Sequence, residues 1–298
     1  MNSPLVATSL TKRFSRQTAL RSLSLTIPSG RIVGLLGRNG AGKTTLLNLA
    51  CGLLLPTSGS CLTLGRSVAD LDTPELTRLG VVLQEARFLE WMTVAQHLEF
   101  TAAFYPAWDR TREKRLLADL QLDAARKIAQ LSTGDRQKLG IILGVCHHPE
   151  LLLLDEPISA LDPIARSQML GFLIDLIRED GATIVISSHL LADVEKIIDW
   201  VVCLEAGELT TNAAFDELQE SYAEWIVTSS NGRLPASFAE PFVLTHTGDA
   251  RCARLRVRTT DGSESGRFAA HHQAEVEIRR LNLDEMFPLL IQSRGDQP

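Results

Sequence analysis

Residues 37–45 read GRNGAGKTT, and this stretch decides the fold because it separates two apolar segments of different periodicity. The segment before it, GRIVGLLG (30–37), is typical of a short buried strand. The segment after it, KTTLLNLACGLL (43–54), has helical spacing. Four residues fill every fixed position of the pattern G-x-x-x-x-G-K-[ST]: Gly37, Gly42, Lys43 and Thr44. A strand, a glycine loop and a helix in this order predict a loop that binds a polyphosphate.

The residue types of this loop suit a nucleotide. Glycines let the backbone point several N–H groups at phosphate oxygens, and the helix that follows presents its positive end. Lys43 is expected to reach the β- and γ-phosphates of ATP, and the Thr44 hydroxyl to hold Mg²⁺. The alternative is a glycine turn with a solvated lysine. The other loop positions are expected to bind the same nucleotide: Arg38, Asn39, Gly40, Ala41 and Thr45.

An acidic pair ends a second buried strand, LLLLDEP (151–157). Asp155 is expected to hold Mg²⁺, directly or through water, and Glu156 to orient and deprotonate an attacking water. The alternative is a pair that caps a helix at Pro157. Beside a phosphate loop, the pair favours nucleotide hydrolysis.

Composition excludes several other classes of function. The chain has 298 residues and a net charge of −6 without a basic stripe, so nucleic acid is not an expected partner. The five cysteines lack the spacing of a zinc site. No apolar run approaches the length that spans a bilayer, so a role at a membrane would require another chain.

Strands that alternate with helices predict an α/β core. Residues 92–148 have no strong strand pattern and predict a helical insertion. The composition changes near residue 222, where short strands and polar turns predict a small α+β appendage over 223–298. His271 and His272 adjoin each other there, but no carboxylate cluster with ligand spacing supports a metal, so we expect surface polar residues rather than a metal site.

The stretch LSTGDRQKLGI (131–141) resembles the signature L-S-G-G-Q of ATP-binding cassette (ABC) proteins. Three more features occur in the order of that family: Gln84 at a strand end, SALD at 159–162, and His189 after the strand IVISS. With the phosphate loop and the acidic strand, six motifs cover residues 1 to about 215. The resemblance implies a P-loop NTPase cassette of the ABC type over residues 1–222, with a helical subdomain at about 85–148, and the appendage as a separate domain.

The resemblance also implies roles for further residues. Gln84 would contact Mg²⁺ and the water, and His189 would contact the γ-phosphate and position the water with Glu156. Ser132 and Gly134 would contact the γ-phosphate held by a second cassette, because members of the family dimerise head to tail.

Two residues in the family's pattern have less specific alternatives. Asp162 would lie across the dimer interface. Phe14 stands where the family has an aromatic ring that stacks on adenine, although a packing phenylalanine is the alternative.

One departure from the family's pattern weakens the expected site. Thr133 and Asp135 replace a glycine and the glutamine of the usual signature. Because Asp135 would add negative charge near a bound phosphate, we expect a competent but weaker composite site.

The function implied is that of an ATPase subunit, bound peripherally at the cytoplasmic face of the membrane. It would work as a homodimer or heterodimer with separate transmembrane permease subunits, in export rather than import. Residues 86–94 would contact the permease, although packing within the helical insertion is equally compatible. The alternatives are a soluble ABC ATPase without a transport role and a nucleotide-gated regulator.

Overall fold

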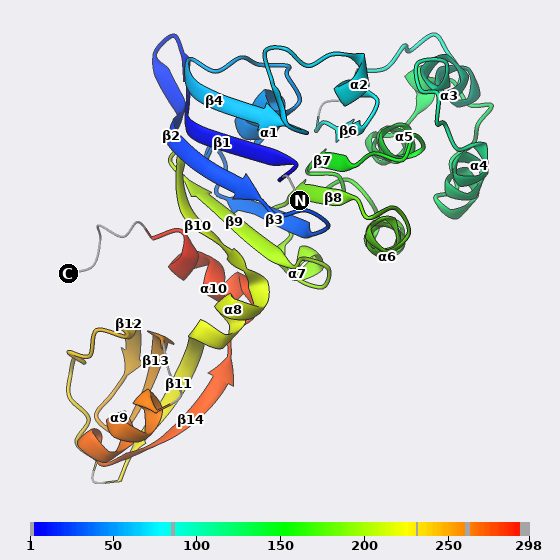
Figure 1. Ribbon diagram of the computed structural model, residues 1–298. Coiled ribbons are helices and arrows are strands. Elements are labelled where there is room, and N and C mark those ends of the chain that lie inside the picture. The colour runs from blue at the N-terminus through cyan, green and yellow to red at the C-terminus, as the bar shows by residue number, and fades with distance from the viewer. Residues whose placement is uncertain (1–2, 85–86, 231, 260–262, 293–298) are drawn as a thin grey trace. The chain divides into compact units, whose positions relative to one another are not determined.

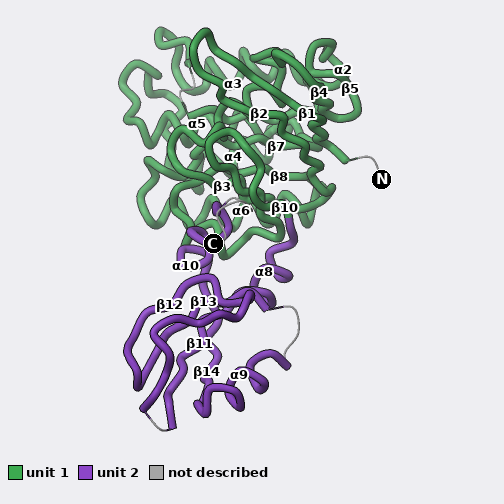
Figure 2. The backbone as a smooth tube through the Cα atoms, turned by 90° about the vertical axis from the view of Figure 1, so that its left-hand side faces the viewer, with its two compact units in different colours: residues 1–212, 293–298 green, residues 213–292 purple. Residues whose placement is uncertain are grey.

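The computed structural model describes residues 3–84, 87–230, 232–259 and 263–292. The chain divides into two compact units, of which the first covers residues 1–212 and the second residues 213–292 (Figures 1 and 2). The boundary predicted at residue 222 lies ten residues later than this division, and the helix at 215–221 falls between the two positions. Each unit has its own hydrophobic core.

A six-stranded sheet forms the centre of the first unit, in the order β10-β9-β3-β8-β7-β6. The pairs β9-β3, β3-β8, β8-β7 and β7-β6 are parallel. Every residue of β7 and β8 is buried, as expected for strands covered on both faces. The strands are β3 (Ile32–Gly37), β6 (Leu79–Val82), β7 (Leu151–Asp155), β8 (Thr183–Ser187), β9 (Trp200–Glu205) and β10 (Glu208–Ala214).

A second, antiparallel sheet follows the order β2-β1-β4-β5. Its buried leucines alternate with exposed residues along β2, so one face of the sheet packs on the core. The strand patterns before residue 30 are interrupted by register shifts in β1, which explains why the sequence gives no simple strand signal there. The strands are β1 (Leu5–Phe14), β2 (Gln17–Ile27), β4 (Ser58–Thr63) and β5 (Arg66–Ser67).

Helix α1 (Lys43–Ala50) connects the two sheets, because it contacts β2 and β4 on one side and β3 and β7 on the other. Its buried leucines belong to the core cluster of this unit. Three further helices complete the α/β part: α2 (Thr73–Leu76), α6 (Pro163–Asp180) and α7 (Leu191–Val194).

The predicted helical insertion is present as three α-helices and a turn of 3-10 helix (Figure 1). Arg112 of α4 is buried and binds Asp180 at the end of α6 with an N–O distance of 2.8 Å, which ties the insertion to the α/β part. The elements are α3 (Val94–Ala102), α4 (Arg110–Asp119), the 3-10 turn Ile128–Gln130 and α5 (Thr133–Val145).

The second unit is the α+β appendage, built on an antiparallel sheet in the order β12-β13-β11-β14. Trp225 and Phe268 are buried at the centre of its core, where their rings lie 5.4 Å apart. Short strands separated by polar turns were predicted for this unit, whereas the helix at 264–272 was not. The elements are α8 (Phe215–Ser221), β11 (Tyr222–Ser229), β12 (Val243–Gly248), β13 (Cys252–Arg258), α9 (Glu264–His272), β14 (Ala274–Arg280) and α10 (Leu283–Leu290).

Within the described residues, no helix has both the length and the apolar character needed to cross a membrane.

Candidate functional site

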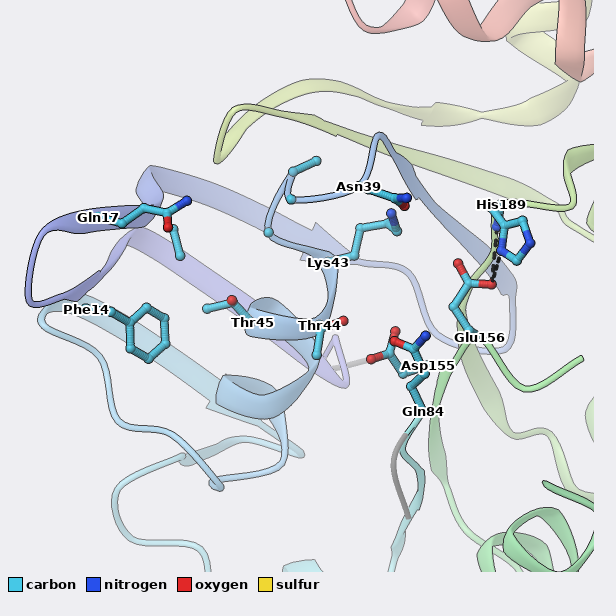
Figure 3. Close-up of a pocket in the computed structure, with 14 residues that line it drawn as sticks. Phe14, Gln17, Asn39, Lys43, Thr44, Thr45, Gln84, Asp155, Glu156 and His189 are labelled. Carbon is cyan, nitrogen blue, oxygen red and sulfur yellow. Dashed lines mark hydrogen bonds and ion pairs between the residues drawn. The ribbon is translucent and has the colours of Figure 1, made fainter. Parts of the chain in front are cut away.

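A cleft of about 620 Å³ lies at the edge of the six-stranded sheet where its parallel strands end. Ligands of open α/β sheets bind at this edge, because loops from neighbouring strands converge there. The lining brings together residues predicted from separate motifs (Figure 3). The residues that line the cleft are Phe14, Gln17, Ala19, Asn39, Gly40, Ala41, Gly42, Lys43, Thr44, Thr45, Gln84, Asp155, Glu156 and His189, of which Gln17 and Ala19 were not predicted.

The glycine loop requires glycine at its two ends. Gly37 and Gly42 have φ angles of 157° and 107°. A Cβ atom at Gly37 would lie 2.5 Å from the Leu204 carbonyl oxygen, and one at Gly42 would lie 2.7 Å from a methyl group of Leu20. Gly42 is also the N-cap of α1, and it has no side chain to occupy the N–H groups of the first turn. The start of α1 can therefore bind an anion.

Lys43 is already held inside the cleft. Its Nζ donates to the carbonyl oxygens of Gly37 and Arg38, at 2.7 and 3.3 Å, and the residue is 8% exposed. Burial lowers the pKa of Lys43, whereas the nearby carboxylates of Glu156 and Asp155 raise it. A partly desolvated ammonium group beside the start of a helix is well placed for a phosphate.

Ser187 joins the two acidic residues at the end of β7. Its Oγ donates to Asp155 Oδ1 at 2.6 Å and accepts from the main-chain N–H of Glu156 at 2.9 Å. Asp155 Oδ2 is buried and has no hydrogen-bond partner in the described part of the chain. A buried oxygen without a partner is unfavourable unless a ligand binds it. With the oxygens of Thr44 and Gln84 lining the same cleft, this atom fits a hard divalent cation.

Glu156 and His189 lie together at one end of the cleft (Figure 3). His189 Nδ1 lies 2.7 Å from Glu156 Oε2, and its main-chain N–H approaches the same oxygen at 3.4 Å. Glu156 is buried and has a left-handed φ of 51°, a conformation that is strained for glutamate. Its carboxylate is thus fixed in the cleft by its neighbours, as a general base must be.

Phe14 lies at the opposite end of the cleft from this pair (Figure 3). Its ring is 42% exposed, and Lys12 Nζ lies 5.1 Å from the ring centroid. Gln17 lines the same end and was not predicted. An exposed ring with a free face can stack on a flat heterocycle.

The signature segment does not line this cleft. Neither Ser132 and Gly134 of that segment nor Asp162 is among the described residues that line it. Ser132 caps α5, since its Oγ accepts from the Asp135 N–H at 3.1 Å. Asp162 caps α6 in the same way. A Cβ atom at Gly134 would lie 2.8 Å from the Ala160 carbonyl oxygen, so α5 packs closely against the turn after β7.

Asp135 is not the free negative charge that the sequence suggested. Arg126 binds its carboxylate with an N–O distance of 3.1 Å, and Lys138 lies 3.6 Å away. The sequence hid this pairing because Arg126 precedes the motif by several residues and has no pattern of its own.

Two positioning residues were missed. Ser187 occupies the last position of β8, and Gln137 follows Gly134 by three residues, one helical turn later. Two features of the sequence could have pointed to these residues. One is the pair of serines before His189, and the other is the position of Gln137 one helical turn after Gly134.

In residues 86–94, the segment expected to contact the permease, the described residues differ from one another in exposure. Ala86 lies outside the described residues. Phe88 is half-buried and packs edge-on against His97 at 5.5 Å, as part of the helical insertion. Trp91 is 70% exposed and Leu89 is 36% exposed.

Comparison with known proteins gives a consistent result. Residues 20–159 match the family described as ABC transporter. The bacitracin transport ATP-binding protein BcrA of Enterococcus faecalis is 33% identical over 298 residues, which cover 96% of each protein. BcrA of Bacillus licheniformis is 33% identical over 236 residues, which cover 78% of this chain and 77% of BcrA.

Solved structures agree with the sequence matches. An ATP-binding subunit of an ABC transporter superposes with a TM-score of 0.67 at 26% identity, over 73% of this chain and 92% of that one. A dimeric cassette in a post-hydrolysis state, bound to ADP and Pi, superposes with a TM-score of 0.63 at 27% identity, over 70% and 98%.

Proposed function

Because this chain belongs to the ABC transporter family, as an ATP-binding and ATP-hydrolysing subunit, we propose that it drives export through separate transmembrane subunits. The observation that carries the proposal is the single cleft that joins the phosphate loop, the acidic pair and His189. The substrate class that fits best is a peptide antibiotic or a compound of similar kind, since two relatives are named for bacitracin transport.

Each group in the cleft has a role in binding or hydrolysis. Lys43 and the N–H groups of the loop bind the β- and γ-phosphates, while Phe14 stacks on the adenine. Thr44, Gln84 and Asp155 would hold Mg²⁺, which neutralises charge on the phosphates when it is bound. Glu156 accepts a proton from the attacking water, and His189 keeps the Glu156 carboxylate oriented.

Hydrolysis requires two cassettes. The chain has one phosphate loop and one signature, and the signature does not line its own cleft. A head-to-tail dimer would bring Ser132 and Gly134 of one subunit to the γ-phosphate held by its partner, with Asp162 at the interface. The dimeric relative with ADP and Pi supports this arrangement. The partner cassette can be a second copy or a homologue.

The permease would contact the helical insertion near Gln84. Trp91 and Leu89 are exposed there, and Phe104 is 63% exposed on the same insertion. Exposed aromatic side chains of this kind anchor protein interfaces. This surface would face a cytoplasmic helix of a transmembrane subunit, with the chain held peripherally at the cytoplasmic face of the membrane.

Co-purification tests the proposal. We would tag the Glu156→Gln chain, solubilise membranes in mild detergent with ATP, and identify stoichiometric partners by mass spectrometry. A partner with several transmembrane helices is expected, and Trp91→Ala in the same background should lose it while ATP binding persists. Leu53→Ala, which removes a side chain 61% exposed outside this surface, is the control. Recovery of soluble partners alone would contradict the proposal.

A further inference from the structure

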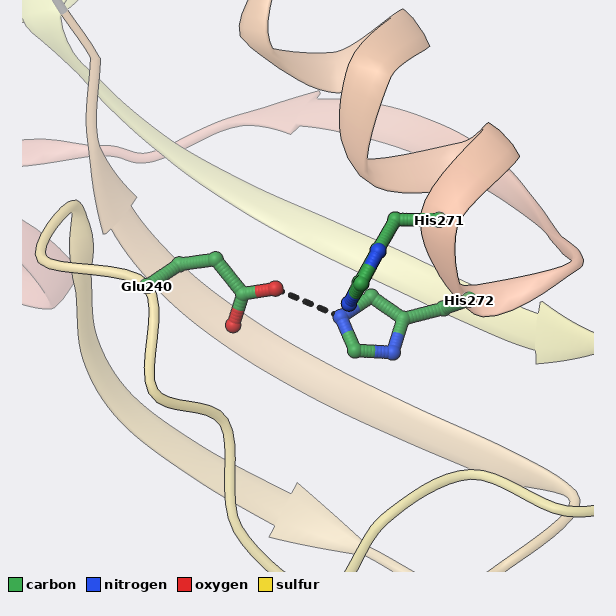
Figure 4. A group of neighbouring side chains, drawn as sticks. All are labelled: Glu240, His271 and His272. Carbon is green, nitrogen blue, oxygen red and sulfur yellow. Dashed lines mark hydrogen bonds and ion pairs between the residues drawn. The ribbon is translucent and has the colours of Figure 1, made fainter.

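The second unit contains a cluster of three metal-ligating side chains that the sequence did not reveal. Glu240 lies in the segment before β12, and His271 and His272 end α9 (Figure 4). Each residue offers one ligand atom, and these atoms lie within 4.8 Å of one another. Spacing along the chain does not reveal the carboxylate, because Glu240 precedes the histidines by about thirty residues and the fold alone brings it near.

One oxygen of the cluster lacks a partner. Glu240 Oε1 lies 2.6 Å from His272 Nε2. Glu240 Oε2 is buried and has no hydrogen-bond partner among the residues that the structure describes. Buried carboxylate oxygens without partners are rare in proteins and call for an explanation. A bound cation would supply one, because it satisfies a carboxylate more fully than a single imidazole does.

The His272 ring is held in a fixed orientation. Phe268 packs on it with a centroid distance of 4.3 Å, and Phe238 packs edge-on at 5.4 Å. These contacts leave Nε2 pointing at Glu240. The His271 ring lies nearly perpendicular to that of His272, at 4.7 Å, and is exposed. An orientation fixed by apolar packing is what keeps a metal-binding imidazole in place.

The cluster borders a cavity of about 390 Å³, which Glu240 and His271 line together with Phe242, Glu264, Arg267 and Phe268. The cavity leaves room for water or another ligand beside the three side chains. A site of two imidazoles and one carboxylate with an open fourth position is a recognised arrangement for Zn²⁺.

We propose that Glu240, His271 and His272 bind a borderline divalent transition-metal ion, for which Zn²⁺ is the representative. Imidazole and carboxylate ligands suit such ions better than they suit Mg²⁺ or Ca²⁺. At bond lengths near 2.1 Å, tetrahedral ligand atoms lie roughly 3.4 Å apart. The Glu240–His272 pair, now 2.6 Å apart, would therefore open by somewhat less than an ångström when the ion binds. The ion would link the segment before β12 to the end of α9, and this role is independent of the nucleotide cleft.

Calorimetry on the full chain tests the site. The chelator-treated, nucleotide-free protein is titrated with Zn²⁺, and Co²⁺ is added to a second sample to record the visible absorption of a coordinated ion. One ion per chain is expected in the wild-type protein. Because His271 is exposed, His271→Ala removes a ligand without disturbing the core, and it should weaken Zn²⁺ binding by about 10- to 100-fold. Glu240→Gln should have an effect of the same size.

Glu277→Gln is the matched control for Glu240→Gln, since this exposed carboxylate of β14 belongs to the same unit and lies outside the cluster. It should retain the wild-type affinity and the wild-type Co²⁺ spectrum. Two results would overturn the proposal: a wild-type chain that binds no Zn²⁺ at about 100 µM, or equal Zn²⁺ affinity in the wild type, His271→Ala and Glu240→Gln. The melting temperature of each metal-free variant shows that the comparison is made between folded proteins.

Discussion

The side-chain amide of Gln137 donates a hydrogen bond of 2.8 Å to the main-chain carbonyl of Glu156. This bond joins α5, the helix of the signature segment, to the turn that follows β7. The same amide nitrogen lies 3.0 Å from Ser159 Oγ, and Gln137 Oε1 accepts from the Ala160 N–H at 3.0 Å. Three bonds from one side chain thus fix the backbone that follows β7. Movement of α5 would be transmitted to the Glu156 carboxylate through this residue.

Substitution of Gln137 by alanine should therefore slow hydrolysis more than it weakens binding. Loss of these bonds leaves the Ala160 N–H unpaired and lets Glu156 shift, which at about 1–2 kcal/mol corresponds to a roughly tenfold lower turnover. ATP affinity should change by less than about threefold, because no phosphate contact is removed. Steady-state phosphate release and a fluorescent ATP analogue measure the two quantities. Gln168→Ala, at an exposed position of α6, is the control. Equal loss of affinity and turnover would contradict a positioning role.

Replacement of Glu156 by glutamine should remove the general base and keep the shape of the site. Turnover should fall by roughly 10² to 10⁴, with ATP binding intact. The variant should also accumulate as an ATP-bound dimer, since hydrolysis no longer separates the subunits. Phosphate release and size-exclusion chromatography with ATP measure these outcomes.

Two further variants distinguish the loss of the general base from the loss of ATP binding and from the loss of an unrelated carboxylate. Lys43→Ala should lose tight ATP binding, because the ammonium group at the start of α1 is removed. Glu208→Gln, which changes an exposed carboxylate on β10, should match the wild type. Full turnover in Glu156→Gln would contradict the assignment of Glu156 as the base.

The α/β cassette, its helical insertion and the α+β appendage could be predicted from the sequence because their patterns are local. Buried parallel strands such as β7 and β8 read as continuous apolar runs, and the glycine loop has fixed spacing. The phosphate loop, the acidic pair and His189 follow strands of one parallel sheet, where motif order is enough to bring them to one edge. Their individual roles stay predictions.

What the sequence could not supply are contacts between distant segments. Ser187 binds Asp155 across neighbouring strands, Arg126 neutralises Asp135, and Glu240 meets two histidines through the fold of the appendage. Each of these depends on side-chain direction and loop course, which have no periodic signal. The register shifts of β1 hid the antiparallel sheet for the same reason.

Two glycines in helices should respond in opposite ways to alanine. At Gly134 the added Cβ would lie 2.8 Å from the Ala160 carbonyl, so α5 or the turn after β7 must move. Overpacking of this kind costs about 1–3 kcal/mol, and turnover should fall with stability. At Gly171 of α6 nothing lies within 4 Å of the added atom, so alanine should stabilise the chain by about 0.5–1 kcal/mol through helix propensity. Melting temperatures and ATPase rates of the two variants give the comparison; a stabilised Gly134→Ala would contradict the close approach.

His147 should make the first unit sensitive to acid. It is buried against Tyr105, with ring centroids 4.1 Å apart, and its Nε2–H donates to the Leu79 carbonyl at 3.2 Å. Burial lowers the pKa of His147 from 6.5 to about 4. Between these pH values the imidazole is therefore protonated in the unfolded chain and neutral in the folded chain. Stability should therefore fall as the pH drops from 6.5 toward 4, by up to about 3 kcal/mol from this group alone.

The measurement compares urea unfolding at about pH 7 and pH 5 in a Trp225→Phe background, where the remaining tryptophans report on the first unit. His147→Gln keeps a donor for the Leu79 carbonyl and removes the titrating ring. Its loss of stability between these pH values should be smaller than that of the parent by about 2 kcal/mol. An unchanged difference would show that the buried imidazole does not cause the acid sensitivity.

Arg126, with Lys138 at a longer distance, should balance the negative charge that Asp135 adds to the signature segment. Arg126 pairs with Asp135 at a partly exposed site, so the ion pair contributes at most about 1 kcal/mol to stability. The pairing also cancels a negative charge beside the proposed γ-phosphate position. In the Glu156→Gln background, Asp135→Asn alone should strengthen ATP-driven dimerisation several-fold, because it leaves the charge of Arg126 unpaired beside the proposed phosphate position. Arg126→Gln should weaken dimerisation several-fold, and Asp135→Asn added to it should restore most of the loss. Sedimentation at low and high salt measures this cycle, and the effect should shrink at high salt because ions screen the exposed charge. If dimerisation is not weakened in Arg126→Gln, Arg126 does not neutralise Asp135, and the variant signature must be tolerated by another contact.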